Sequence, residues 1–257
     1  MHRWRVEFVL VAMCLATAIG GFGCRSRPAG GSASNDGNGG IEIILPASLE
    51  AQRNFYSNEI DSASLQVVEW FNSNGFTDVP RALIRKAIVF DTRETARSAV
   101  AAAFGTDTGN VPATFSGTVN DSTLYVVSPE IYKEIWVKLY PGWQWSHDTY
   151  RSLLVHELTH RAHALVCRVR FGTEDAMGPN WFFEGLAMHC AGQFPVAEGG
   201  QQAFSDEEMQ NLIGPGKTPP VSYPVYARIV GTLAQKYSLH ELILRAREKD
   251  FPFGNQR

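Results

Sequence analysis

Two histidines separated by three residues carry the clearest chemical signal in this chain. They stand in the pentapeptide His156-Glu157-Leu158-Thr159-His160. Residues four apart in an α-helix lie about 40° apart around the axis and roughly 6 Å along it, so both imidazoles can reach one metal ion. The spacing suits two nitrogens at about 2.0–2.1 Å from a single Zn²⁺. We therefore predict that His156 and His160 are zinc ligands.

Glu157 stands between these histidines in the sequence but points in another direction. It is rotated by about 100° from His156 around the helix, so it does not join them as a ligand. Zinc lowers the pKa of a bound water from 15.7 toward roughly 7. A carboxylate beside such a water can take its proton, which makes Glu157 the expected general base.

The segment around this motif is apolar enough to be a helix that runs through a protein core. Apolar residues recur from Arg151 to Arg170 at helical spacing. This pattern explains the helix without a metal, with the histidines as ordinary core residues. It does not explain three polar groups on so apolar a stretch, because each unpaired group would cost about 1–3 kcal/mol. A bound metal removes that cost, which favours the metal site.

The third ligand has to come from outside this helical turn. A catalytic zinc site generally has three protein ligands and one open position. His163 lies on the same side of the helix, but a third ligand from one straight helix would sit too far along its axis. Glu184 stands 24 residues after His160, in an apolar segment where an isolated carboxylate needs a partner. The remaining candidates are Glu174, Asp175 and His189.

Residues 151–190 resemble the gluzincin zinc metallopeptidases. In that family H-E-x-x-H is followed 20 or more residues later by a helix with the pattern W-x-x-E-G-[FL]-A, and residues 181–187 of this chain read WFFEGLA. The resemblance implies that Glu184 is the third zinc ligand. It also implies a zincin-like fold and hydrolysis of a peptide or protein substrate, with Zn²⁺ as the cofactor.

The same family often supplies a tyrosine that stabilises the oxyanion of the tetrahedral intermediate. The segment from Val221 to Tyr237 resembles the helix that carries it. Aligned by apolar periodicity, Tyr223 takes the catalytic place, and Tyr226 takes it if the register differs by one turn. The chain lacks G-x-M-E-N, the element with which gluzincin aminopeptidases hold a free amino terminus. An endopeptidase is therefore expected.

The resemblance leaves open which residue orients a ligand histidine. Met188 stands four residues after Glu184, where some relatives have an acidic residue near the metal ligands. The orienting group must then come from elsewhere. Asp148, His163 and His189 are the candidates.

The order of predicted elements places strands first and helices last. We predict strands at 41–45 and 83–90 and a β-hairpin of 115–119 and 123–127, with Asn120-Asp121 as its turn. We predict helices at 47–74, 93–104, 130–139, 148–171, 180–193, 222–237 and 239–249. This order indicates an α+β fold, in which a small N-terminal mixed sheet packs on a helical half that carries the H-E-x-x-H helix. From the family resemblance, strand 123–127 is expected to bind an extended peptide at its edge.

The N-terminus has the pattern of an export signal, which we assign to residues 1–23. A basic start precedes an apolar run of 12 residues, Phe8 to Ile19, too short for the roughly 20 residues of a membrane span. Residues 21–24, GFGC, resemble the lipobox of bacterial lipoproteins, although Gly21 stands where that motif usually has leucine. The resemblance implies a lipid anchor at Cys24 and a place in the cell envelope, in the periplasm or on the outer surface. The alternative is secretion, with Cys24 left as a thiol.

Composition sets the remaining bounds. Residues 24–40 are rich in Gly, Ser, Asn and Ala, which predicts a flexible tether before one domain at 41–257. The net charge of −3 gives no indication of a nucleic-acid partner. Cys167 and Cys190 are the cysteines of the predicted domain, and spacing alone leaves open whether they form a disulfide or stay as buried thiols. The alternative to an enzyme is a zincin-like module that binds or scaffolds without catalysis. The intact Glu157 argues against it.

Overall fold

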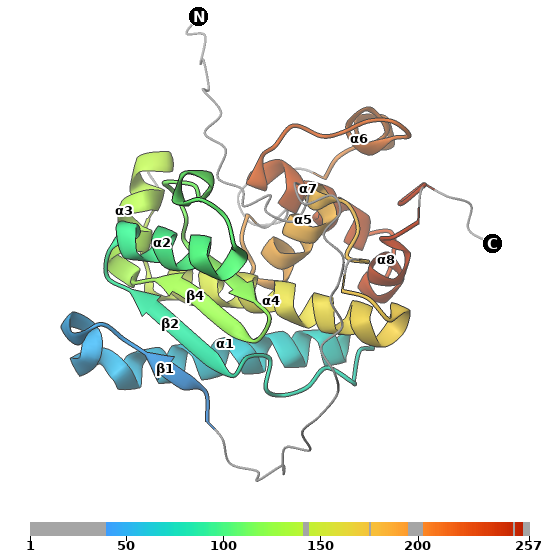
Figure 1. The fold of residues 1–257 in the computed structure, drawn as a ribbon. Coiled ribbons are helices and arrows are strands. Elements are labelled where there is room, and N and C mark those ends of the chain that lie inside the picture. The colour runs from blue at the N-terminus through green and yellow to red at the C-terminus, as the bar shows by residue number, and fades with distance from the viewer. Residues whose placement is uncertain (1–39, 141–143, 175, 195–202, 249, 254–257) are drawn as a thin grey trace, which may run out of the picture.

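The computed structural model describes residues 40–140, 144–174, 176–194, 203–248 and 250–253 (Figure 1). The predicted signal peptide and nearly all of the predicted tether, Cys24 included, lie outside these ranges. Within them the chain has mixed α and β structure, with a small sheet and a helical majority. The predicted combination of a mixed sheet and a helical half is confirmed.

The sheet has four strands, of which three are parallel. They are β1 (Glu42–Ile44), β2 (Lys86–Phe90), β3 (Gly117–Asn120) and β4 (Thr123–Val127). Their order in the sheet is β1-β2-β4-β3. β1, β2 and β4 run parallel to one another, and β3 runs antiparallel to β4. β1 and β3 are therefore the edge strands.

This order shows that the prediction of edge binding by strand 123–127 is wrong. β4 pairs with β2 on one side and with β3 on the other. Both rows of its backbone hydrogen-bonding groups are thus used inside the sheet. On this side of the sheet, β3 is the strand that pairs with no further strand among the described residues.

The hairpin between β3 and β4 is confirmed, with its turn one residue later than predicted. Asn120 pairs with Thr123, so the turn residues are Asp121 and Ser122. Asp121 has a φ of +52°. Aspartate adopts this left-handed conformation more readily than most residues, because its short side chain can hydrogen-bond locally.

Eight α-helices and two short 3₁₀ helices lie in the described parts of the chain. The 3₁₀ helices are η1 (Ala47–Gln52) and η2 (Thr108–Asn110). The α-helices are α1 (Arg53–Ser73), α2 (Arg93–Phe104), α3 (Pro129–Leu139), α4 (His147–Phe171), α5 (Asn180–Cys190), α6 (Asp206–Ile213), α7 (Tyr223–Ala234) and α8 (Leu239–Arg245). Most predicted helices agree to within a few residues, and α6 was not predicted. The predicted helix at 47–74 starts as η1 and becomes α-helical at Arg53.

The helix α4 lies at the centre of the fold. It packs against α1, against α5 and against the edge strand β3, and α5 in turn packs closely on α7. Figure 1 shows α2 above the sheet and α1 below it. One hydrophobic core connects the sheet with these helices. The residues of α4 therefore meet both the sheet and the C-terminal helices.

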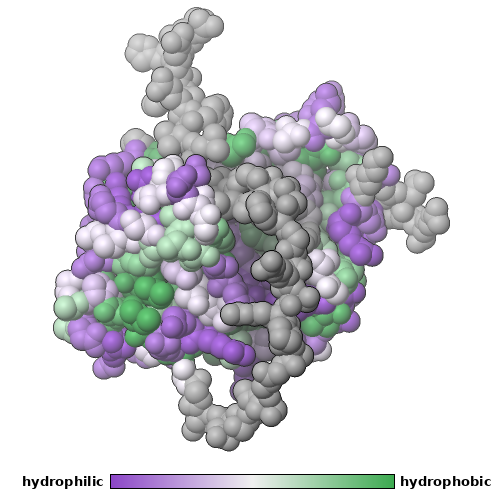
Figure 2. All heavy atoms as spheres, in the orientation of Figure 1, coloured by the Kyte–Doolittle hydropathy of each residue, from purple (hydrophilic) through white to green (hydrophobic). Residues whose placement is uncertain are grey.

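Few large apolar side chains are exposed in the parts of the chain that the structure describes. The face in Figure 2 is covered mainly by polar residues, with a smaller apolar area at the left, over the sheet. The exposed large apolar residues belong to different segments, as is usual on protein surfaces; they are Ile44, Leu65, Val137, Val169 and Val221. Among the described residues, no helix combines the length and the apolar character that a membrane span requires.

Candidate metal centre

Local sequence signals fix both ends of α4. The Ser146 hydroxyl accepts a hydrogen bond from the Thr149 backbone N–H, and the Thr149 side chain accepts one from the Ser146 N–H. This capping box satisfies two donors that a helix start leaves unpaired. Gly172 ends the helix at a φ of +74°, a conformation that favours glycine. The helix is buried along its middle, where His156 and Glu157 lie.

A close contact between α5 and α7 positions the second element of the site. Gly185 follows Glu184 on α5. A Cβ at Gly185 would lie 2.6 Å from the backbone oxygen of Tyr226 and 2.6 Å from Val230 Cγ2. The missing side chain therefore lets α7 pack directly on the α5 backbone. This contact explains why the carboxylate of Glu184 is followed by a glycine.

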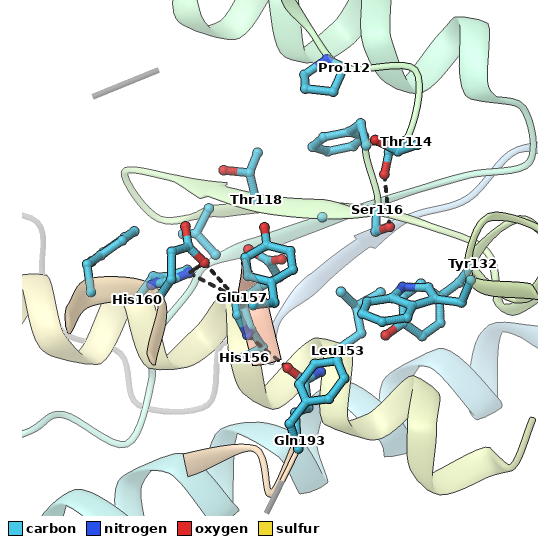
Figure 3. Close-up of a pocket in the computed structure, with 18 of the residues that line it drawn as sticks. Pro112, Thr114, Ser116, Thr118, Tyr132, Leu153, His156, Glu157, His160 and Gln193 are labelled. Atoms are coloured by element: carbon cyan, nitrogen blue, oxygen red, sulfur yellow. Dashed lines mark hydrogen bonds and ion pairs between the residues drawn. The ribbon is translucent and has the colours of Figure 1, made fainter. Parts of the chain in front are cut away.

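The structure brings the three predicted ligands together (Figure 3). His156 Nε2 lies 3.1 Å from His160 Nε2. Glu184 Oε2 lies 3.3 Å from His156 Nε2 and 3.7 Å from His160 Nε2. Ligand atoms arranged tetrahedrally about 2.0–2.1 Å from one Zn²⁺ would be about 3.3 Å apart. The three side chains thus fit a single small cation.

The polarity of these groups supports the same conclusion. Glu184 is 5% exposed, and its Oε2 makes no hydrogen bond of standard geometry with the described residues, although the Nε2 atoms of His156 and His160 lie 3.3 and 3.7 Å away. An ionised carboxylate that is buried without compensation costs several kcal/mol. Burial also keeps the pKa of His160 well below its ordinary value, so that imidazole stays neutral and can ligate. A divalent cation between the three groups would supply the missing positive charge.

Gln193 orients the first of the two imidazoles. Its Oε1 lies 3.1 Å from His156 Nδ1. The amide oxygen can only accept a hydrogen bond, so Nδ1 carries the proton and Nε2 presents its lone pair to the centre. Gln193 was not predicted from the sequence. None of the three predicted candidates, Asp148, His163 and His189, forms a hydrogen bond to His156 or His160 in the described part of the chain.

The second imidazole is held by an aromatic ring. Phe183 stacks on His160 with ring centroids 3.9 Å apart and an angle of 17° between the planes. Because Phe183 directly precedes Glu184 on α5, one short segment supplies both a ligand and the support for another. Phe183 thus contacts a candidate ligand, whereas Phe182 lies in the hydrophobic core.

The edge strand β3 passes directly over Glu157. A Cβ at Gly117 would lie 2.8 Å from Glu157 Cγ and 3.1 Å from its Cδ. Glu157 is 7% exposed, and burial raises its pKa to about 7, with the nearby Glu184 carboxylate adding to the effect and His156 opposing it. A carboxyl group with a pKa near neutrality is well matched to accept and return a proton at neutral pH.

The structure distinguishes between the two candidate tyrosines. Tyr223 lines the cavity at the metal centre, and its ring centroid lies 6.3 Å from that of His156. Tyr226 is 3% exposed and belongs to the hydrophobic core near Gly185, and it does not line the cavity. Tyr223 is therefore the tyrosine that can reach a bound ligand.

Other candidate ligands lie elsewhere. Glu174 forms an ion pair of 3.1 Å with Arg161 and a second with Arg168. Asp175 lies outside the described residues. His189 is partly buried and packs edge-on near Trp70.

Cys167 and Cys190 are both buried free thiols. No disulfide joins them, so of the two alternatives left open by the sequence the structure has the buried thiols. Burial raises the pKa of each thiol to about 12.

His163 is a buried imidazole next to the site. It is 1% exposed, neither ring nitrogen has a hydrogen-bond partner among the described residues, and burial lowers its pKa to about 3. In the unfolded chain this imidazole takes up a proton below about pH 6.5, whereas in the fold it stays neutral. Acid therefore favours the unfolded state, and the contribution of His163 to stability falls as the pH drops from about 6.5 toward 3.

We expect His163→Leu to reduce the acid sensitivity of folding. Between pH 7 and pH 5, the metal-free wild type should lose about 2 kcal/mol more unfolding free energy than the variant. Urea unfolding in the presence of a chelator at both pH values measures this difference. Parallel losses in the two proteins would contradict the neutral state of His163.

Comparisons with protein-family models, with curated proteins and with solved structures found no match. The likeness of residues 151–190 to the gluzincins is a likeness of motif. The geometry described above is what supports a metal centre.

Proposed function

We propose that this chain is a zinc-dependent endopeptidase of zincin-like fold. Its Zn²⁺ would be held by His156, His160 and Glu184. The observation that carries the proposal is their convergence at 3.1–3.7 Å, with Glu157 beside them in the same open cavity. A metal site that served only to hold the fold would gain nothing from a carboxylate base in a cavity that a ligand can enter.

Each group around the candidate centre has a separate role in the proposed hydrolysis. When bound there, Zn²⁺ would supply Lewis acidity for the scissile carbonyl and for the attacking water. Glu157 accepts the proton that the attacking water loses and carries it to the departing amine. Tyr223 donates a hydrogen bond to the carbonyl oxygen as negative charge develops, a contribution of about 2.7–4 kcal/mol in comparable sites.

The edge strand β3 is suited to hold the substrate. Its free edge can add one extended peptide strand through backbone hydrogen bonds. Because Gly117 places β3 against Glu157, a peptide paired to this edge would pass the base and the metal ligands. Backbone pairing recognises any extended sequence, which suits an endopeptidase.

Gly117→Ala should reduce turnover and leave zinc bound. The added methyl group would lie 2.8 Å from Glu157 Cγ, so either the base or the strand has to move. A displacement of about 1 Å at a catalytic group can cost up to roughly 100-fold in rate. Peptide cleavage and zinc content measured on the same preparation test this expectation. Gly109→Ala is the matched control, because its Cβ would meet nothing within 4 Å.

Cleavage by the purified protein tests the proposed function directly. A panel of denatured proteins is incubated with the zinc-loaded chain, with a chelator, and with chelator followed by excess zinc. We expect fragments that disappear with the chelator and return with zinc. A zinc-loaded protein that cleaves nothing would instead favour a non-catalytic binding or scaffolding module of the cell envelope.

We also propose that the protein is exported and anchored to a membrane by lipid at Cys24. The support is the sequence of residues 1–24, with its basic start, short apolar run and lipobox-like end. Cys24→Ser should abolish incorporation of a labelled fatty acid and move the protein from the membrane to the soluble fraction. A wild-type protein that is exported but never labelled would contradict the anchor.

A further inference from the structure

The cavity at the metal centre extends past Glu157 into an aromatic pocket. We call this part of the cavity the α3 pocket. It is lined by Tyr132 and Trp136 from α3, Leu153 from α4, and Phe194 after α5. Figure 3 shows Tyr132 and Leu153 on the side of Glu157 that faces away from His160. Leu153 precedes His156 by about one helical turn. Both residues line the same cavity, so the α3 pocket is continuous with the candidate metal centre.

Neighbouring rings hold the walls of this pocket in place. The Trp136 ring lies 5.7 Å from Tyr132 and 6.2 Å from Phe194, and it stacks on Tyr140 at 4.9 Å. Such ring pairs have preferred geometries and restrict one another. The α3 pocket is thus a preformed apolar recess, as binding sites for apolar groups usually are.

The size of the cavity suits one large side chain beside a peptide backbone. Its volume is about 240 Å³. An apolar cavity of about 150 Å³ is enough for a benzene ring. The α3 pocket and the space above the ligands can therefore take an aromatic ring together with part of the chain that carries it.

The chemistry of the lining selects against charged groups. Apart from Glu157 and Glu184, no aspartate, glutamate, lysine or arginine of the described residues lines the cavity. A charged substrate side chain would enter without a partner for its charge, which is unfavourable. An apolar side chain would gain from leaving water, in proportion to the area buried.

We propose that the α3 pocket binds a large apolar side chain, preferentially aromatic, next to the bond that is cleaved. Trp136 is then the residue that determines specificity. The identity of the ligand as a peptide rests on the proposed function. The preference for an aromatic group rests on the pocket itself.

Hydroxamates test the pocket without requiring turnover, because their head group binds zinc. Acetohydroxamate, 3-phenylpropanohydroxamate and succinate monohydroxamate carry a methyl, a benzyl-containing and a carboxylate group. Calorimetry on the zinc-loaded chain should show the phenyl compound binding at least about tenfold tighter than the methyl compound. The carboxylate compound should gain nothing. Equal affinities for all three would overturn the proposal.

Trp136→Ala separates a specific role from a structural one. The phenyl-to-methyl affinity ratio should fall several-fold in this variant, whereas general damage would weaken both compounds equally and leave the ratio unchanged. Val137→Ala is the matched control, since Val137 is the exposed neighbour on α3. An unchanged ratio in Trp136→Ala would overturn the role of Trp136.

Mapping of cleavage positions in denatured proteins completes the test. Enrichment of Phe, Tyr, Trp or Leu at one fixed position beside the cleaved bond supports the α3 pocket, and cleavage without such enrichment contradicts it. If the hydroxamates show the phenyl preference and no protein is cleaved, the pocket stands and the proposed endopeptidase function fails.

Discussion

Replacing Glu157 with glutamine is expected to reduce turnover by about 10²–10⁴-fold while zinc stays bound. The amide keeps nearly the same shape but cannot accept a proton at neutral pH. Glu157 is not one of the converging ligands, so metal affinity should change little. The measurements are kcat for cleavage of a peptide or denatured protein and zinc content by mass spectrometry.

A second glutamate serves as the control for this substitution. Glu207 is exposed on α6, outside the residues that line the cavity, so Glu207→Gln should leave both turnover and zinc content unchanged. Turnover that survives in Glu157→Gln would exclude Glu157 as the base. Loss of zinc from Glu157→Gln would show that this carboxylate binds the metal instead.

Glu184→Ala is expected to remove zinc from the protein. Loss of a residue that merely orients a ligand typically costs 10–100-fold in metal affinity, and loss of a ligand itself should cost more than about 100-fold. Zinc raises the melting temperature of a protein that binds it only in the folded state. We therefore expect the zinc-dependent rise of the melting temperature to be lost in Glu184→Ala and retained in the wild type.

Glu174→Ala tests the choice of ligand. Glu174 was the other glutamate considered as third ligand from the sequence, and the structure pairs it with Arg161 and Arg168. Its removal should leave zinc content and the thermal shift intact. Zinc loss in Glu174→Ala together with zinc retention in Glu184→Ala would exclude the assignment of the ligands.

The candidate ligand set could be predicted from the sequence because it depends largely on local rules. Helical spacing alone places His156 and His160 on one side of α4. Glu184 was predicted as the third ligand from its apolar segment and its motif. Its Oε2 lies 3.3 Å from His156 Nε2 and 3.7 Å from His160 Nε2, close enough to share one cation with them. Tyr223 was chosen over Tyr226 by periodicity, and the structure places it at the cavity.

Features that depend on distant parts of the chain could not be predicted. The order of strands in a sheet cannot be read from the strands themselves. β4 was therefore predicted to have a free edge, although it pairs with β3 on one side and with β2 on the other. Gln193 reaches His156 from 37 residues away, and glutamine has no spacing rule that marks this role. The separation of Cys167 and Cys190 likewise depends on how α5 docks on α4.

One missed element did have a local signal. Ser205 and Glu208 form a reciprocal capping box at the start of α6, and serine followed three residues later by glutamate is readable in the sequence. The short length of α6, which ends at Ile213, gives a periodic pattern little room to appear.

Because Cys167 and Cys190 are free thiols, the proposed cation would also act as a link within the fold. A cation held by His160 and Glu184 would join α4 to α5 across 24 residues of sequence. A cation that binds only the folded chain would stabilise it by its binding free energy. Since no disulfide joins the two described cysteines, removal of such a cation would weaken the connection between α4 and α5. If zinc is the cation, as we propose, zinc starvation would expose α5 to local opening and proteolysis as well as stop catalysis.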